Sequence, residues 1–373
     1  MWQAEARVDL DAIRDNVALL KAGTSAEVMA VVKGDGYGHG AVPSAKAALA
    51  GGATWLGVCT LTEALELREA GITVPILAWL IAPDAPLHQA VEAGVDLNAA
   101  SLGQLDEVVA AGKRAGRAVR VHLKIDTGLN RNGAPAAQWP ALVEAAAKAE
   151  AVGDAEIVGV WSHFVYADVP DHETTDRQLA AYKDALAVAE RAGITPQVRH
   201  LANSAATLTR PDTHFDVVRP GIAIYGLSPV EGQSFGLRPA MTAHARIALV
   251  KRVPAGEGVS YGHTYFTQRE TTLALVPLGY ADGVPRHASN VGPVWINGKR
   301  YAIAGRVCMD QIVVDCGDDP VAAGDEAVLF GPGDRGEPLA DDWAAAIGTI
   351  NYEIVTRFGS QRVPRRYAGG ADG

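Results

Sequence analysis

The sequence has little of what marks nucleic-acid-binding proteins or metalloproteins. Its 33 lysines and arginines are outnumbered by 43 acidic residues, and the resulting net charge of -10 argues against a nucleic-acid partner. Its three cysteines (Cys59, Cys308 and Cys316) are scattered without the spacing of a metal site. An odd number of scattered cysteines fits free thiols in a reducing compartment. We therefore expect a cytoplasmic protein without a bound metal.

Long hydrophobic runs are also missing. The most apolar window, residues 74–82, is too short to cross a bilayer and has prolines near both ends. The first seven residues lack a basic segment followed by an apolar core, so we expect no secretory signal. Apolar residues nevertheless make up 48% of the 373 residues, and charged residues only 20%. This balance predicts a soluble protein with a substantial core and no membrane association.

Short apolar runs alternate with alanine-rich helical stretches over most of the chain. The expected strands are residues 28–33, 54–58, 76–80, 95–98, 119–125, 157–162, 197–201 and 216–219. About eight strand–helix units of this length predict an α/β fold, a (β/α)8 barrel of the TIM type. A doubly wound open sheet is the alternative, but no Gly-x-Gly-x-x-Gly turn follows any of these strands.

A second pattern begins after residue 227. Short strand-like segments, the first of them residues 241–253, are separated by turn signals, among them Asn297-Gly298, which is a strong hairpin dipeptide. A helix is expected to open near Asp341. We therefore predict two domains, a barrel in residues 1–230 and a mainly-β domain in residues 231–373. At the other end of the chain, a short strand within residues 4–10 precedes a helix that opens at Asp11.

Residues 28–40 contain the first functional signal. An apolar, β-branched run ends at Lys33, and four glycines lie among the next seven residues. Burial among apolar neighbours disfavours an ammonium, which makes such a lysine a neutral nucleophile suited to Schiff-base chemistry. The alternative is a surface lysine at the end of a strand. The glycines favour the first interpretation, because a simple connection rarely needs so much backbone freedom.

Lys33 followed by Tyr37-Gly-His39-Gly40 resembles the lysine motif of the alanine racemases, which bind pyridoxal 5'-phosphate (PLP). The family usually has Ala-Asn-Ala, or a near variant, where this chain has Gly-Asp-Gly in residues 34–36. Further motifs follow in the family's order, so the resemblance covers the whole chain. They lie in residues 121–133, 161–168, 201–207, 217–226, 256–265, 277–283, 305–311 and 350–353. The resemblance also implies that the first strand pairs with the second domain.

Residues 121–133 combine a lysine, an aspartate and an arginine at the end of a strand. From the residues alone, Arg131 is suited to grip a substrate carboxylate, and an ion pair with Asp126 is an equally good explanation. The resemblance implies that Arg131 binds the substrate carboxylate. It further implies that Lys124, at a position that is often carbamylated in the family, holds this arginine. Leu129 stands where the family usually has methionine.

Several other positions resemble the family's cofactor site. Asn203 and Ser204 open a helix, where they either cap it or help its free N–H groups hold a phosphate. The cofactor contacts that the resemblance implies are Lys33, Tyr37, His163, Asn203, Ser204, Arg219, Gly221, Ile222 and Tyr352. Arg219 would face the pyridine nitrogen. A guanidinium keeps its proton, which leaves that nitrogen unprotonated and suits racemisation better than transamination.

Residues 256–265 match the loop that carries the family's catalytic tyrosine, here Tyr261. Because tyrosine ordinarily has a pKa near 10, a tyrosine base needs assistance at neutral pH. In the family, a histidine and an arginine assist the tyrosine, and they correspond to His163 and Arg219. An aromatic side chain that anchors a turn is the alternative. The resemblance also implies a gating tyrosine, a methionine at the substrate carboxylate and an aspartate at the entrance, at Tyr280, Met309 and Asp310.

The sequence therefore predicts PLP-dependent racemisation of L-alanine and D-alanine by two bases, supplying D-alanine for cell-wall peptidoglycan. Lys33 would take the proton from D-alanine and Tyr261 from L-alanine. The resemblance implies a head-to-tail homodimer in which Tyr261, Tyr280 and Met309 act in the partner's site.

Three alternatives stay open. A serine racemase is one, because an apolar pocket rejects an added hydroxyl only by about a hundredfold. A PLP-dependent decarboxylase of basic amino acids shares the architecture, but it pairs the ring nitrogen with an acid, whereas this chain has Arg219. A non-enzymatic PLP carrier built on the barrel would not need a β domain with Tyr261.

Overall fold

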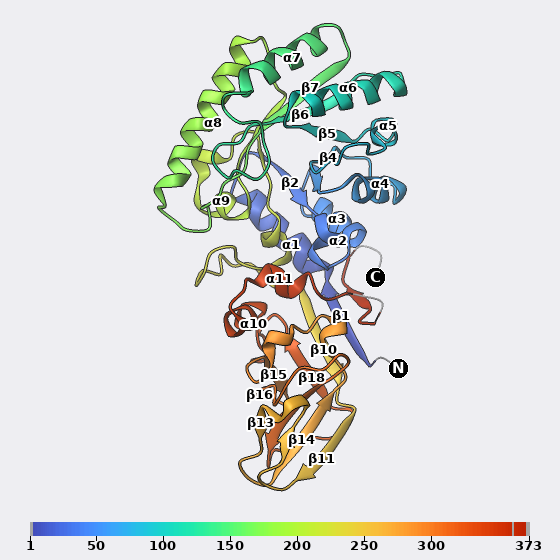
Figure 1. Ribbon diagram of the computed structural model, residues 1–373, viewed down its shortest axis with the longest axis vertical. Coiled ribbons are helices and arrows are strands. Elements are labelled where there is room, and N and C mark those ends of the chain that lie inside the picture. The colour runs from blue at the N-terminus through green and yellow to red at the C-terminus, as the bar shows by residue number, and fades with distance from the viewer. Residues whose placement is uncertain (1–2, 360–361, 371–373) are drawn as a thin grey trace.

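Eight parallel strands form a barrel in the first two thirds of the chain (Figure 1). The computed structural model describes residues 3–359 and 362–370. The strand order is β8-β7-β6-β5-β4-β3-β2-β9. The gap between β9 and β8 is bridged by hydrogen bonds from Asp216 N to Arg199 O (3.1 Å) and from Arg219 N to Ala202 O (2.9 Å). The strands are β2 (Glu27–Val31), β3 (Trp55–Val58), β4 (Ile76–Ala78), β5 (Asp96–Ala99), β6 (Val119–Lys124), β7 (Ala155–Trp161), β8 (Val198–His200) and β9 (Val217–Val218). The predicted barrel is confirmed.

Helices cover the outside of this sheet (Figure 1). They are α1 (Leu10–Ala22), α3 (Ala41–Ala50), α4 (Leu61–Glu69), α5 (Leu87–Glu92), α6 (Leu102–Ala115), α7 (Trp139–Ala151), α8 (Glu173–Arg191) and α9 (Ser204–Thr209). In α6, for example, the buried residues Leu105, Val108 and Ala111 recur at three-residue spacing and face the strands. Helix α1 begins at Leu10, just before the predicted start, because the Asp9 carboxylate accepts a hydrogen bond from Ala12 N (3.0 Å) and caps the helix.

The inside of the barrel is partly polar. Val121 and Leu123 of β6 pack in the large apolar cluster, whereas His122 and Lys124 alternate with them and project to the opposite face of the sheet. The interior also contains a small apolar cluster, which consists of Met29, Trp55, Leu77, Val158, Val198 and Val217. The alternation of β6 therefore places ionisable side chains inside the barrel.

The described residues of the second part of the chain, together with the first strand, form three sheets below the barrel in Figure 1. The largest has the order β16-β15-β18-β10-β1-β19, with β1 (Ala4–Asp9) antiparallel to β10 and parallel to β19. Its other strands are β10 (Met241–Arg246), β15 (Pro293–Ile296), β16 (Lys299–Ala302), β18 (Glu326–Phe330) and β19 (Arg365–Ala368). The second sheet contains β11 (Leu249–Val253), β14 (Thr271–Val276) and β17 (Ile312–Gly317), and in the third β12 (Gly258–Val259) pairs with β13 (Tyr265–Phe266). A mainly-β domain was predicted, and this is confirmed.

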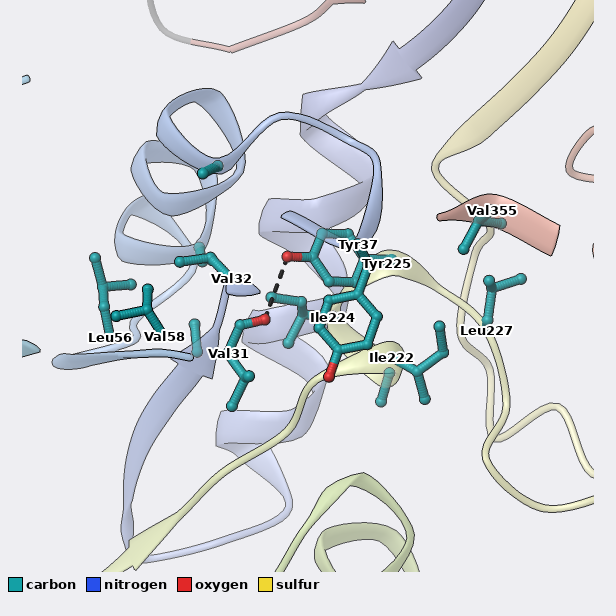
Figure 2. Close-up of a cluster of buried hydrophobic side chains, with 14 of the residues drawn as sticks. Val31, Val32, Tyr37, Leu56, Val58, Ile222, Ile224, Tyr225, Leu227 and Val355 are labelled. Atoms are coloured by element: carbon teal, nitrogen blue, oxygen red, sulfur yellow. Dashed lines mark hydrogen bonds between the residues drawn. The ribbon is translucent and has the colours of Figure 1, made fainter. Parts of the chain in front are cut away.

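Two details of this domain differ from the predicted pattern. Residues 241–253 were expected as one strand-like segment, but the chain divides them into β10 and β11, which lie in different sheets. Beyond the expected helix, α10 (Ala340–Ile347), a second helix α11 (Asn351–Val355) follows. Val355 of α11 lies beside Leu227 in an apolar cluster with Val31 and Tyr225 (Figure 2). The second domain thus reaches the end of β2, where Lys33 follows.

Residues 3–359 and 362–370, which the structure describes, contain no helix that is both long and apolar enough to cross a membrane.

Candidate active site

Lys33 begins a left-handed turn, α2 (Lys33–Tyr37), immediately after β2. The φ angles of Gly34, Asp35, Gly36 and Tyr37 are 61°, 51°, 63° and 52°. This conformation costs a residue with a Cβ about 1–2 kcal/mol, and glycine avoids the cost. The strand was expected to reach Lys33, but it ends at Val31 because the turn begins at Lys33. The two glycines of the Gly-Asp-Gly segment, where this chain departs from the family pattern, can adopt the positive φ angles of this turn without strain.

The turn is held from both domains. Glu63 of α4 accepts a hydrogen bond from Gly34 N through Oε1 (2.6 Å), while its Oε2 accepts from Cys59 N (2.8 Å) and Thr60 N (2.9 Å). Asp35 forms an ion pair with Arg365 of β19. The position of Lys33 therefore depends on a barrel helix and on the last strand of the chain.

The Lys33 amine is half-buried among aromatic rings. Its Nζ lies 5.8 Å from the centre of the Trp79 ring and 6.0 Å from that of Tyr37. Burial lowers the pKa of Lys33, and the nearby cations Arg131 and Arg219 lower it further. A lysine with a lowered pKa is more often a neutral amine, which is the form that can act as a nucleophile and a base.

Hydroxyl groups and backbone N–H groups converge beside this turn. Tyr37 and Tyr352 have ring centres 6.2 Å apart, and Ser204 Oγ accepts hydrogen bonds from Gly221 N (2.8 Å) and Ala223 N (3.3 Å). A Cβ on Gly221 would lie 2.3 Å from Tyr37 Oη, so only glycine leaves this approach open. Burial raises the pKa of both tyrosines, which keeps their hydroxyls protonated as donors. This donor set fits a phosphate group.

The two candidates at the start of α9 have different contacts. Asn203 is the N-cap, because its Oδ1 accepts from Ala206 N (3.0 Å). Ser204 instead faces the segment that begins at Gly221, as described above. Ile222 is fully buried and begins the short 3-10 helix η2 (Ile222–Tyr225) directly after Gly221. The capping interpretation therefore accounts for the side chain of Asn203, while Ser204 belongs to the donor set.

Lys124 ends β6 and is buried, with Nζ 3.9 Å from the centre of the Trp161 ring. Burial lowers its pKa to about 7, and the charges of Arg219 and Arg131 contribute to this shift. An ordinary lysine has a pKa near 10.4 and is almost fully protonated at neutral pH. Lys124 is therefore an amine with a large neutral fraction near pH 7.

Arg131 is exposed at the loop that follows β6. In the part of the chain that the structure describes, it forms no ion pair with Asp126. The Asp126 carboxylate accepts instead from Gly128 N (2.8 Å) and Asn130 N (3.1 Å) and so shapes its own loop. The sequence left open an ion pair between Arg131 and Asp126, and this ion pair is not formed among the described residues.

Arg219 is buried at the end of β9 and held by backbone acceptors. Its Nη2 donates to Ser162 O (2.8 Å) and Leu201 O (3.2 Å) and lies 3.4 Å from His163 Nδ1. Burial lowers the pKa of Arg219 to about 10, which still leaves it charged at neutral pH. Burial and this neighbouring charge lower the pKa of His163 well below its usual value, so the imidazole is neutral.

Four predicted residues lie together on the β domain instead. Tyr261, Tyr280, Met309 and Asp310, which we call the tyrosine patch, are all exposed, and Tyr261 is 71% exposed. The segments that carry them are joined by hydrogen bonds from Tyr280 N to Cys308 O (3.0 Å) and from Ala281 N to Met309 O (2.9 Å), and by Ser260 Oγ donating to Arg306 O (2.7 Å). Asp310 also pairs with Arg362 (2.6 Å).

Within one chain, the tyrosine patch is remote from Lys33. Tyr261 lies between β12 and β13, and Figure 1 shows β13 well apart from α2. The structure thus gathers one group of predicted residues around the end of the barrel, consisting of Lys33, Tyr37, Lys124, His163, Ser204, Arg219, Gly221 and Tyr352. It places Tyr261, Tyr280 and Met309 outside that group.

Sequence reasoning missed several residues at the barrel end. Glu63 was not expected to hold the Lys33 turn, and its only signal was the Thr-x-x-Glu pattern of a capping box at Thr60. His122 and His200 were overlooked inside strands that had been treated only as apolar runs. The alternation of His122 with Val121 and Leu123 would have identified it as a residue inside the barrel.

The chain matches known proteins along almost its whole length. The family model "Alanine racemase, N-terminal domain" matches residues 8–229, and "Alanine racemase, C-terminal domain" matches residues 240–367. The chain is 71% identical to the alanine racemase of Salinispora arenicola over 99% of both chains. It is 54% identical to that of Mycobacterium avium, with 95% of this chain and 92% of the relative covered.

Solved structures give the same result. The alanine racemase of D-cycloserine-producing Streptomyces lavendulae superposes with a TM-score of 0.98 at 55% identity, covering 100% of this chain and 98% of the other. That of Bacillus anthracis, solved with bound L-Ala-P, superposes with a TM-score of 0.90 at 38% identity, covering 100% and 96%.

The contact between Glu63 and the Lys33 turn can be tested by Glu63→Gln. The glutamine has one oxygen where the carboxylate has two, so at least one of the three N–H groups loses its acceptor. We expect the free energy of unfolding to fall by about 1–2 kcal/mol. Glu66→Gln, an exposed position on the same helix, is the matched control and should change it by less than about 0.5 kcal/mol. Urea unfolding of both variants measures this, and equal midpoints would contradict the role of Glu63.

Proposed function

The chain belongs to the alanine racemase family of isomerases, and from this membership we propose that it interconverts L-alanine and D-alanine with bound PLP. The product D-alanine would serve cell-wall peptidoglycan. The observation that carries the proposal is the convergence at the barrel end of a lysine with a lowered pKa, a phosphate-type donor set and a buried arginine.

The residues present fit PLP. Lys33 would bind it covalently through its amine. Tyr37, Ser204, Tyr352 and the backbone around Gly221 would hold its phosphate. Arg219 would face the pyridine nitrogen and donate a hydrogen bond to it while keeping its own proton. When bound, the cofactor withdraws electrons from the amino acid and makes the Cα proton more acidic.

Racemisation requires proton transfer on both faces of Cα. Because Lys33 is fixed on one side by the turn and its contacts, one amine does not reach both faces, and a second base is needed. Lys33 would remove the proton from D-alanine and return it there. We propose that Tyr261 performs the same transfer for L-alanine on the opposite face.

Tyr261 would have to come from a second subunit. It is exposed and remote from Lys33 in its own chain, together with the rest of the tyrosine patch. We propose a head-to-tail homodimer in which each tyrosine patch lies over the partner's barrel. His163 would then meet the incoming hydroxyl and link it to Arg219, whose positive charge would favour the deprotonated form of the tyrosine. Tyr280, Met309 and Asp310 would line the entrance and the substrate carboxylate site.

Arg131 and Lys124 would complete the substrate site. Arg131 is exposed and free of Asp126, so its guanidinium is available to a substrate carboxylate. The neutral amine of Lys124 would attack carbon dioxide, forming an N–C bond and releasing one proton to give a carbamate. That reaction turns a potential cation into an anion beside Arg131, where it would orient the guanidinium.

The reaction is tested by proton NMR of L-alanine with the PLP-loaded protein in deuterated water, followed by chiral analysis. We expect the Cα proton signal to disappear while the enantiomers approach equal amounts, and Lys33→Ala to show neither change. An unchanged alanine spectrum would overturn the proposal. Exchange of serine alone, or release of carbon dioxide from lysine or arginine, would then identify one of the alternative reactions.

The origin of the second base is tested by mixing two inactive variants, Lys33→Ala and Tyr261→Phe. If each site combines Lys33 of one chain with Tyr261 of the other, random exchange of subunits restores about one quarter of the native sites. We therefore expect a mixture that was dissociated and reassembled to regain about a quarter of the wild-type racemase activity. A mixture as inactive as its components would show that both bases belong to one chain.

Carbamylation of Lys124 is tested by carbon NMR with isotopically labelled bicarbonate. Because the reacting form is the neutral amine and the pKa of Lys124 is lowered to about 7, we expect a carbamate signal that increases as the pH rises through this value. The signal should vanish in Lys124→Gln and persist in Lys113→Gln, whose lysine is exposed and paired with Asp154 (2.8 Å). A signal that survives in Lys124→Gln would place the carbamate elsewhere.

A further inference from the structure

A chain of buried polar side chains crosses the barrel interior beneath Arg219. Arg219 Nη1 lies 3.1 Å from His200 Nδ1, His200 Nε2 lies 2.9 Å from His122 Nδ1, and His122 Nε2 lies 3.2 Å from Asp96 Oδ2. All four residues are buried, with 4% exposure or less. They come from β5, β6, β8 and the residue after β9, and we call them the histidine relay.

The two ends of the histidine relay determine the direction of its hydrogen bonds. Arg219 can only donate, and an ionised Asp96 can only accept. His122 therefore carries its proton on Nε2, toward Asp96, and accepts on Nδ1. His200 must then donate through Nε2, which leaves Nδ1 free to accept from Arg219. Each histidine is consequently restricted to the tautomer with the proton on Nε2.

The ionisation states agree with this arrangement. Burial opposes the charge on Asp96, but hydrogen bonds from His122 and Arg120 outweigh it and lower the pKa of this carboxyl. Burial and the charge of Arg219 lower the pKa of His200 well below its usual value, so this ring is neutral and carries a single proton. Between β2 and β9, Asp96 is the only buried carboxylate among the residues that the structure describes.

The surrounding side chains fix the ring planes. The Trp161 ring is stacked on His200 with centres 5.4 Å apart and planes at 12°, and Trp55 meets His122 edge-on at 5.8 Å. A Cβ on Gly159 would lie 2.2 Å from His122 Nδ1, so the missing side chain makes room for this ring. Two tryptophan rings and a glycine are therefore packed so that both imidazole rings of the histidine relay are held in place.

We propose that Asp96 and His122 are positioning residues, which hold His200 in the tautomer that accepts from Arg219 and thereby fix the orientation of the guanidinium toward the reaction site. Nη2 is held by two carbonyls, whereas Nη1 has His200 as its acceptor. Without that acceptor the guanidinium is free to turn about its carbonyl contacts. The functional part of this inference rests on the proposed racemase function, whereas the tautomers are a property of the cofactor-free protein.

The tautomers are measured by nitrogen NMR of the cofactor-free protein labelled in histidine. We expect His122 and His200 to carry their single proton on Nε2. A proton on Nδ1 of His200, or a doubly protonated His200, would overturn the proposal. This measurement needs no variant and no racemase activity. An inactive protein with the expected tautomers would therefore contradict the proposed function and leave the histidine relay intact.

The effect on the reaction is tested by His122→Phe, which keeps a ring in place but removes the acceptor for His200. We expect kcat to fall by about 10-fold or more, as when the orienting partner of a functional group is lost, with the KM for alanine changed little. His200 should also acquire a population protonated on Nδ1.

Tyr182→Phe is the matched control. Tyr182 Oη accepts a hydrogen bond from the backbone N–H of His200 (3.1 Å), so this substitution also removes a buried polar group that contacts His200. The side-chain hydrogen bonds of the histidine relay stay unchanged. We expect its kcat to stay within about twofold of wild type, because it removes no orienting contact of Arg219. Equal losses in both variants, or an unchanged kcat in His122→Phe, would show that the histidine relay contributes only to packing.

Discussion

The structure depends on the burial of several cationic side chains at one end of the barrel. Lys33, Lys124 and Arg219 project into the same region, and Asp96 lies behind them as a buried carboxylate. Because charge is costly to bury, the pKa values of both lysines are lowered, whereas the guanidinium of Arg219 stays charged at neutral pH. One environment therefore lowers the pKa of two amines and leaves one guanidinium as a permanent donor. The roles that we propose for the three basic residues differ for this reason.

The placement of Lys33 depends on backbone conformation as much as on charge. The left-handed turn from Gly34 to Tyr37 turns the chain away from β2 within a few residues, so that Lys33 Nζ lies 6.0 Å from the centre of the Tyr37 ring. Such a turn is unfavourable for most sequences and is retained here through glycine and through contacts with Glu63 and Arg365. Since Arg365 belongs to the last strand, which pairs with the first, the ends of the chain support the site from the second domain.

Much of this arrangement was predictable from the sequence, for identifiable physical reasons. Buried parallel strands leave short apolar runs, so the alternation predicted the barrel, and the ordered motifs predicted the family. The left-handed turn at Lys33 and the division of residues 241–253 between two sheets were not predicted, because both depend on tertiary contacts that local propensity does not encode. The histidine relay was missed for the same reason, since His122 and His200 are 78 positions apart and meet only across the barrel.

The exposure of Tyr261 shows how the fold and the proposed assembly are connected. An aromatic side chain that merely anchored a turn would be packed against it, yet Tyr261 is 71% exposed and lies beside the exposed Tyr280 and Met309. Apolar groups gathered on a surface favour burial in an interface. On the barrel of the same chain, Lys33 is the proposed base for one face of the substrate, and Tyr261, the proposed base for the other face, lies far from it. If the two surfaces meet only between subunits, catalysis requires the dimer, and the geometry of the interface becomes part of the proton-transfer machinery.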